Sequence, residues 1–278
     1  MLHFRGNHQG LALVGGGRLG AIMLPQGDYR LAATTDWHTL TLAPLEARTL
    51  MGGLLRVAGD VGWRDRPHWR IESRWSGVDL SRFQPAAKPF LPVLSGKLST
   101  EGYATARDSS VRFKAAWNSG ETWEGLLRGQ TYPWRWREDQ QLDLGWQNLS
   151  RHVPGLGPAE STAGSLQYRG SPTRFQLDTA LAMRSERTPA GDWRLTGQGS
   201  RSGFRSDFFQ YQGEAGAATG SAEASWRPGR VEWSASLGLD AFRNDFWVPD
   251  WPAVLSGRLA ADGVVASGRQ DIRLRDMG

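Results

Sequence analysis

The sequence predicts an all-β protein made of antiparallel strands with short connections. Apolar and polar residues alternate with a period of two along much of the chain, turn-forming residues separate the alternating stretches, and one segment is repeated. Hydrophobic residues make up 39% of the chain, and the mean hydropathy is −0.48. These values suit sheets with one dry face and one wet face.

Seven stretches show the alternation most clearly, and each is predicted to be a strand. Each is bounded by Gly, Pro, Asn or Asp, which interrupt strands and favour turns. Short links favour antiparallel hairpins, because parallel strands need long crossover connections; such links lie at 118–120, 170–172 and 227–229. The strands are expected, in chain order, at residues 55–63, 69–75, 111–117, 142–146, 175–181, 193–195 and 231–239.

Two short segments are expected to form helical turns. They are Asp79–Phe83 and, in a looser form, Asp240–Phe246. Each begins with an aspartate that can cap a helix, and Pro85 and Pro249 follow soon after. We therefore expect short helical turns between repeats of an otherwise all-β chain.

An internal repeat sets the organisation of the chain. Phe90–Gly102 returns as Trp251–Gly263, and the shared Ser-Gly pair recurs 161 residues later (257 − 96). A self-similar unit of this length predicts a modular array. We expect one continuous β-repeat array over residues 1–278, with approximate units at 1–110 and 111–278, the second truncated.

Composition argues against an enzyme or a nucleic-acid-binding protein. The chain has no Cys, and its five histidines are scattered without the spacing of metal ligands. Gly15–Gly20 matches a dinucleotide-binding fingerprint, but Pro25 leaves no room for the helix that should follow. The 33 basic and 28 acidic residues are interspersed, so the net charge of +5 does not predict nucleic-acid binding. We expect no catalytic residues, no cofactor and no metal.

The 14 tryptophans need a separate explanation, because many share the apolar parity of their strands. A sandwich core, the aromatic girdle of an outer-membrane protein, a carbohydrate-stacking platform and a long open groove could each use them. A groove with an apolar floor would bind acyl chains or unfolded hydrophobic segments. Its lipid-binding candidates are Val57, Val61, Trp63, Trp69, Ile71, Val111, Phe113, Leu142, Leu144, Phe175, Leu177, Leu195, Val231, Trp233 and Leu237.

Several motifs, in their order along the chain, resemble the central repeat region of the TamB family. The motifs are Leu142–Leu149, Gly164–Gly170, Gly191–Leu195, Trp226–Trp233 and Asp250–Leu259. This family lies within the AsmA-like superfamily, and the unit length also resembles that of bridge-like lipid transfer proteins. The resemblance covers nearly the whole chain.

The resemblance implies an elongated β-taco, a U-shaped antiparallel sheet with an apolar groove. It also implies a periplasmic location, the outer-membrane protein TamA as a partner, and conduction of glycerophospholipids between the inner and outer membranes. The alternative is a scaffold or chaperone that assembles autotransporters and other outer-membrane proteins with TamA, without lipid conduction. We expect the sequence to be a fragment without the inner-membrane anchor of the full-length protein.

Overall fold

The computed structural model describes residues 2–21, 24–49, 53–64, 66–78, 94–105, 108–129, 140–153, 157–186, 188–246, 250, 252–266 and 269–277. All the regular secondary structure in these residues is β-strand, and consecutive strands within each unit pair antiparallel. This confirms the predicted all-β fold class. The chain divides into two compact units, unit 1 (Met1–Trp134) and unit 2 (Arg135–Gly278). The division into repeat units at 1–110 and 111–278 stays a prediction.

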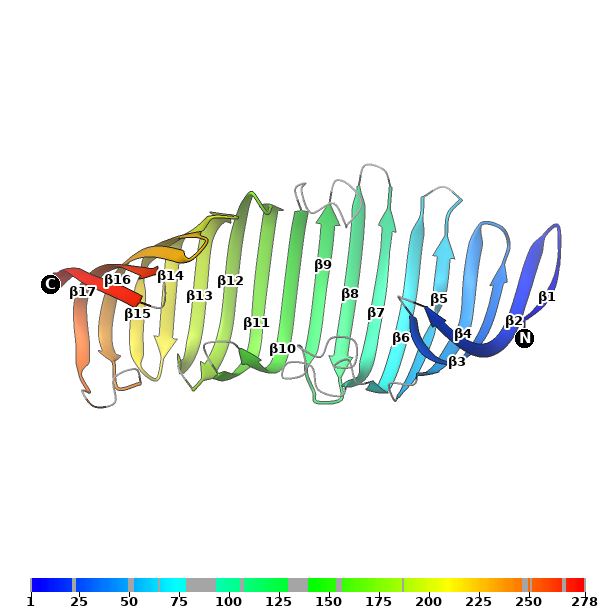
Figure 1. Cartoon of the computed structure of the whole chain (residues 1–278), viewed down its shortest axis with the longest axis horizontal. Helices are drawn as coiled ribbons and strands as arrows, with labels where there is room; N and C mark the ends of the chain where they lie inside the picture. The colour runs from blue at the N-terminus through cyan, green and yellow to red at the C-terminus, as the bar shows by residue number, and fades with distance from the viewer. Residues whose placement is uncertain are drawn as a thin grey trace. The chain divides into compact units, whose positions relative to one another are not determined.

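Among the described residues, unit 1 is a meander of nine strands, each paired with the next (Figure 1). The strands are β1 (Leu2–Asn7), β2 (Gly10–Ala21), β3 (Leu24–Thr35), β4 (Thr39–Thr49), β5 (Leu54–Gly62), β6 (His68–Val78), β7 (Leu94–Ala104), β8 (Ser109–Trp117) and β9 (Thr122–Gly129).

Unit 2 is a second meander of nine strands in its described residues. The strands are β10 (Gln140–Val153), β11 (Gly157–Ser171), β12 (Arg174–Ser185), β13 (Thr188–Ser200), β14 (Gly203–Gly213), β15 (Gly216–Arg227), β16 (Arg230–Arg243), β17 (Val254–Ala266) and β18 (Arg269–Met277).

All seven strands predicted from the alternation are confirmed. They correspond to β5, β6, β8, β10, β12, β13 and β16. The repeated Leu-Ser-Gly motif lies at the start of β7 in unit 1 and of β17 in unit 2. Gly15–Gly20 lies inside β2, so this fingerprint forms a strand and not a phosphate-binding loop.

The helical turn predicted at Asp240–Phe246 is wrong. Asp240–Arg243 continues β16, and the register shifts between Leu239 and Phe242. Ala241 has a φ of 47°, so the backbone bends at a β-bulge. The bulge directs Phe242 into a buried cluster, and this packing outweighs the local capping signal. The other predicted helical turn, Asp79–Phe83, lies outside the described residues.

The best-packed part of unit 2 is an aromatic cluster. Tyr211, Ala215, Ala218 and Phe242 are buried, and Trp193, Phe209 and Leu239 pack against them. The rings of Trp193 and Tyr211 have centroids 4.5 Å apart, and those of Tyr211 and Phe242 lie 5.9 Å apart in an edge-on arrangement. Such aromatic pairs add to the stability that burial alone provides.

Candidate functional site: an apolar face on each unit

The strand register gives unit 2 one apolar face. Paired residues in an antiparallel ladder share a face, and alternate residues along a strand point to opposite faces. One row across the strands is therefore Leu144, Leu166, Thr179, Leu195, Phe209, Gly220, Leu237 and Leu259. The row beside it is Leu142, Tyr168, Leu177, Gly197, Ser206, Ala222, Ala235, Ala261 and Leu274.

The opposite face of unit 2 is polar. The residues between the apolar positions form a row of Gln141, Arg169, Gln176, Gln198, Arg205 and Glu223. On the same sheet, Arg184 Nε donates a hydrogen bond to Glu160 Oε2 at 2.7 Å. The predicted separation of a dry face from a wet face is therefore confirmed in this unit.

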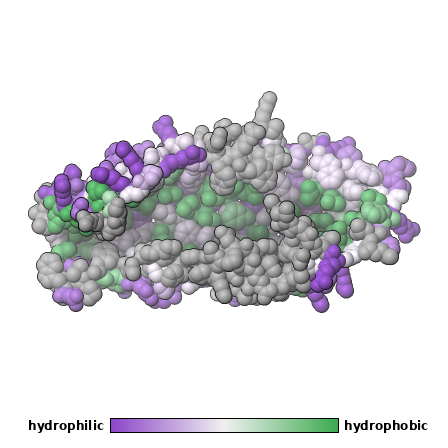
Figure 2. Space-filling model, viewed as in Figure 1, coloured by the Kyte–Doolittle hydropathy of each residue, from purple (hydrophilic) through white to green (hydrophobic). Residues whose placement is uncertain are grey.

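Unit 1 has the same two-faced pattern. Its apolar face includes the rows Leu40, Val61, Trp69, Gly102, Val111, Leu127 and Leu42, Gly59, Ile71, Thr100, Phe113, Gly125. Its polar face carries cross-strand ion pairs, including Arg112 with Glu101 at 3.1 Å and Arg56 with Glu46 at 2.9 Å. Figure 2 shows hydrophobic residues on the visible face of each unit and hydrophilic residues at parts of its edge.

The register places almost all of the predicted lipid-binding candidates on these two apolar faces. In unit 1 they are Val57, Val61, Trp69, Ile71, Val111 and Phe113. In unit 2 they are Leu142, Leu144, Phe175, Leu177, Leu195, Val231, Trp233 and Leu237. Lipid binding at these residues stays a prediction, because their position alone does not identify a ligand.

Trp63 differs from the other candidates, because it lies just beyond the end of β5. Its side chain is 45% exposed, and its indole N–H donates a hydrogen bond to the backbone carbonyl of Trp37 at 2.9 Å. Trp226 makes the matching contact in unit 2, donating to the carbonyl of Arg201 at 2.6 Å. Both tryptophans therefore hold the turn of a neighbouring hairpin.

Among the described residues, no second layer of strands covers the candidates on the apolar faces. Apart from Val231, which is 37% exposed, they are half-buried and not fully buried. Within each unit, the described strands contact mainly their neighbours in the sheet. A closed sandwich would bury this face completely, so that reading of the tryptophans does not fit the described residues.

The sequence pattern did not identify the glycines that lie opposite large aromatic rings on the neighbouring strand. Gly164 pairs with Trp146, Gly102 with Trp69, and Gly263 with Trp233. In each pair, a Cβ on the glycine would overlap with the ring. The internal repeat could have indicated two of these glycines, because Gly102 and Gly263 are the last residues of its two copies.

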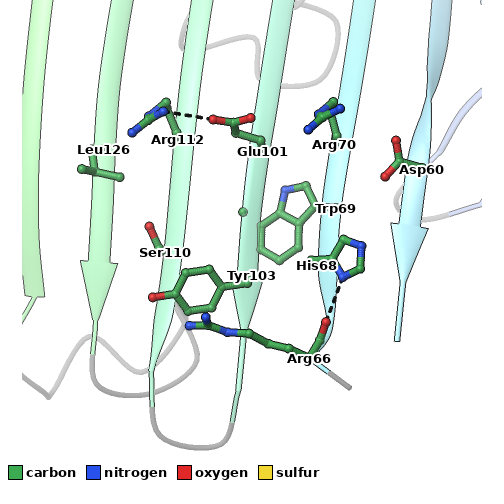
Figure 3. Close-up of a pocket in the computed structure, with 11 residues that line it drawn as sticks. Asp60, Arg66, His68, Trp69, Arg70, Glu101, Tyr103, Ser110, Arg112 and Leu126 are labelled. Carbon is green, nitrogen blue, oxygen red and sulfur yellow. Dashed lines mark hydrogen bonds and ion pairs between the residues drawn. The ribbon is translucent and has the colours of Figure 1, made fainter. Parts of the chain in front are cut away.

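A polar pocket of about 510 Å³ lies on the opposite face of unit 1 (Figure 3). The guanidinium of Arg66 lies 3.0 Å from the centroid of the Tyr103 ring and pairs with Asp108 at 2.9 Å. The hydrogen bond from the Thr105 hydroxyl, with a smaller contribution from Arg66, lowers the pKa of Asp108. Arg66 and Arg112 are each paired with a carboxylate, so their charges are already balanced within the protein. We therefore interpret the pocket as part of a hydrated outer surface.

The described residues contain no group of three or more His, Cys, Asp or Glu side chains that could hold a metal ion. They also contain no helix that is long and apolar enough to cross a membrane.

Comparison with known protein families relates this chain to a known family. The family model for the N-terminal domain of TamB matches residues 110–277, which is more than half of the chain. Neither the curated proteins nor the solved structures include a match.

Proposed function

This chain belongs to the TamB family, and on that premise we propose that it is a segment of a bridge-like protein that conducts glycerophospholipids between the inner and outer membranes. The family takes part in the translocation and assembly module together with TamA. We further propose a periplasmic location for this chain and TamA as the partner of the protein. No catalytic step is part of the proposal.

The observation that carries the proposal is the uncovered apolar face. Each methylene of an acyl chain that leaves water for this face contributes about 0.8 kcal/mol when fully buried. A chain lying along a row such as Leu144–Leu166–Thr179 crosses successive strands roughly 4.8 Å apart. It can move along the row at little net cost, because each methylene that leaves one contact meets the next.

Site-specific crosslinking tests which face meets lipid. Photo-crosslinkers at Phe113 and Leu177 should capture phospholipid from vesicles of phosphatidylethanolamine and phosphatidylglycerol. Crosslinkers at the adjacent Arg112 and Gln176, which lie on the polar faces, are matched controls and should capture little. Equal capture on both faces contradicts the proposal.

The same crosslinking, repeated with an unfolded outer-membrane protein added to the vesicles, separates lipid conduction from a scaffold role. If Phe113 and Leu177 capture segments of unfolded outer-membrane proteins and no lipid, the scaffold alternative replaces the proposal. Mass spectrometry of the crosslinked products identifies the captured molecule in either case.

A further inference from the structure

Aromatic rings on the apolar faces lie over glycines of the neighbouring strand. We propose that these glycines are positioning residues, because they let the rings lie flat against the sheet and keep the lipid-binding face low and level, without ridges. We call each such contact a ring-on-glycine pair. The inference rests on the proposed function and deepens it, because it names the residues that shape the path of the acyl chain. The ligand class that suits a low, level floor is an extended, unbranched acyl chain.

The pair of Trp146 on β10 and Gly164 on β11 shows the geometry most clearly. The two residues face each other in the ladder, and a Cβ on Gly164 would overlap with the six-membered part of the indole. At its other end, the indole N–H donates a hydrogen bond to Ser161 Oγ at 3.0 Å. The hydrogen bond therefore fixes the ring against β11, and the lack of a side chain on Gly164 leaves the space that the ring occupies.

A second group of rings covers glycines in the same way. Phe175 lies over its direct partner Gly199, and Phe204 lies over Gly197, where an added Cβ would be 2.7 Å from the ring. The rings of Phe175 and Phe204 are stacked with centroids 6.3 Å apart, and Tyr168 stacks on Phe175 at 5.4 Å. Together they give this part of unit 2 a continuous aromatic surface.

The internal repeat preserves the pairing. Trp69 and Gly102 face each other between β6 and β7, and Trp233 and Gly263 do so between β16 and β17. An added Cβ would lie 2.6 Å from the Trp69 ring and 2.7 Å from the Trp233 ring. The same contact thus occurs at equivalent positions in both copies, in two separate units.

A side chain beneath the ring would change the surface that a lipid meets. At Gly164 the three atoms nearest to the added Cβ all belong to the Trp146 ring, so we expect the ring to move before the backbone does. The displaced ring would rise from the sheet and form a ridge beside the row that begins at Leu144. An acyl chain would lose contact with the methylenes on either side of that ridge.

The test is a set of alanine substitutions measured by titration with cis-parinaric acid, a fluorescent long-chain fatty acid. Gly164→Ala should raise the Kd about fivefold or more, which is the scale of losing contact with a few methylene groups. Gly238→Ala is the matched control, because Gly238 is also inside a strand but lies on the polar face, where its Cβ would be 3.5 Å from the nearest atom. Its Kd should stay at the wild-type value.

A double substitution separates ring displacement from a general loss of structure. If the ring causes the effect, Gly164→Ala combined with Trp146→Leu should bind as Trp146→Leu does alone. Gly199→Ala, beneath Phe175, repeats the test if Gly164→Ala does not fold.

Two results have different meanings. Wild-type affinity in the folded Gly164→Ala and Gly199→Ala proteins overturns this inference and leaves the proposed function intact. If the wild-type chain binds neither the fatty acid nor phospholipid, the proposed function fails and this inference fails with it.

Discussion

Among the described aromatic residues, Tyr211 on β14 is the most completely buried, and its hydroxyl group links β14 to β13 and to the turn before β15. The hydroxyl donates a hydrogen bond to the carbonyl of Ala190 at 3.0 Å and accepts one from the N–H of Ala215 at 3.1 Å. Tyr211→Phe leaves both backbone groups without this partner, so we expect unfolding to require about 1–3 kcal/mol less free energy. Urea unfolding measures the change, and an unchanged midpoint with an unchanged slope contradicts it.

Asp36 gives a pH-dependent prediction. Its Oδ1 accepts hydrogen bonds from the backbone N–H groups of His38 at 2.9 Å and Thr39 at 2.7 Å, and these lower the pKa of Asp36. A lowered pKa in the folded state stabilises the fold above the unfolded value of about 3.9, and this contribution is lost as the pH falls through the folded value. Asp36→Asn should therefore lower the Tm at neutral pH, and the difference from wild type should shrink as the pH falls below the unfolded value of about 3.9. A difference that is constant with pH contradicts the assignment.

At the scale of elements, two tryptophans stabilise hairpin turns. Trp63 holds the turn between β3 and β4, and Trp226 holds the turn between β13 and β14. In both cases the backbone N–H of the tryptophan also donates to a carbonyl in the turn, His38 at 2.9 Å and Ser202 at 2.9 Å.

Trp226→Phe keeps the backbone bond and removes the indole bond. One such bond contributes about 0.5–1.5 kcal/mol, so amide hydrogen exchange in the β13–β14 turn should be up to about tenfold faster. Exchange in the β3–β4 turn is the internal control, because Trp63 is unchanged. Equal acceleration in both turns would point to a global effect and not to the local bond.

The sequence predicts some strands much better than others. β5, β8, β12 and β16 alternate large apolar and polar residues, so their period is easy to recognise. β15 is built from Gly, Ala, Ser and Thr for most of its length, so its alternation gives little hydrophobic signal. Its assignment depends on pairing with β14 and β16, which a single sequence does not show.

The candidate site was predictable only in part. Parity along each strand identifies residues such as Phe113 and Leu177, because parity is a local property. Which glycine lies beneath Trp146 depends on the register between β10 and β11, which is set by tertiary structure. Trp63 shares the parity of β5, but the strand ends one residue earlier, so parity did not reveal its hydrogen bond to the β3–β4 turn.

Across the described residues of the whole molecule, charged and apolar side chains lie mainly on opposite faces of the sheet in each unit. The ion pairs of the polar faces are exposed; in the pair of Lys114 and Glu124, for example, 69% and 68% of the side chains are accessible. Exposed pairs of this kind contribute little to stability. The folded state therefore depends mainly on the backbone ladders and on the half-buried apolar faces.

Ile71 tests whether the apolar face as a whole conducts lipid. It lies in the row of Gly59, Thr100 and Phe113, its side chain is half-buried, and no second layer of described strands covers it. Ile71→Arg should lower lipid transfer between vesicles severalfold with little loss of folding, because the charged group resists desolvation on the path of the chain. Arg70→Ala on the polar face is the control, and wild-type transfer by Ile71→Arg argues against conduction.

The net charge of +5 offers a competing explanation for any lipid binding, because a basic protein is attracted to anionic vesicles without using its apolar face. Salt distinguishes the two mechanisms: the Debye length falls from about 10 Å at 0.1 M to about 3 Å at 1 M ionic strength, whereas apolar burial is not screened. Capture of phospholipid at Leu177 should therefore persist at about 1 M salt, while adsorption of the protein to anionic vesicles should fall steeply. If capture at Leu177 falls in parallel with adsorption, the apolar face is not the binding surface.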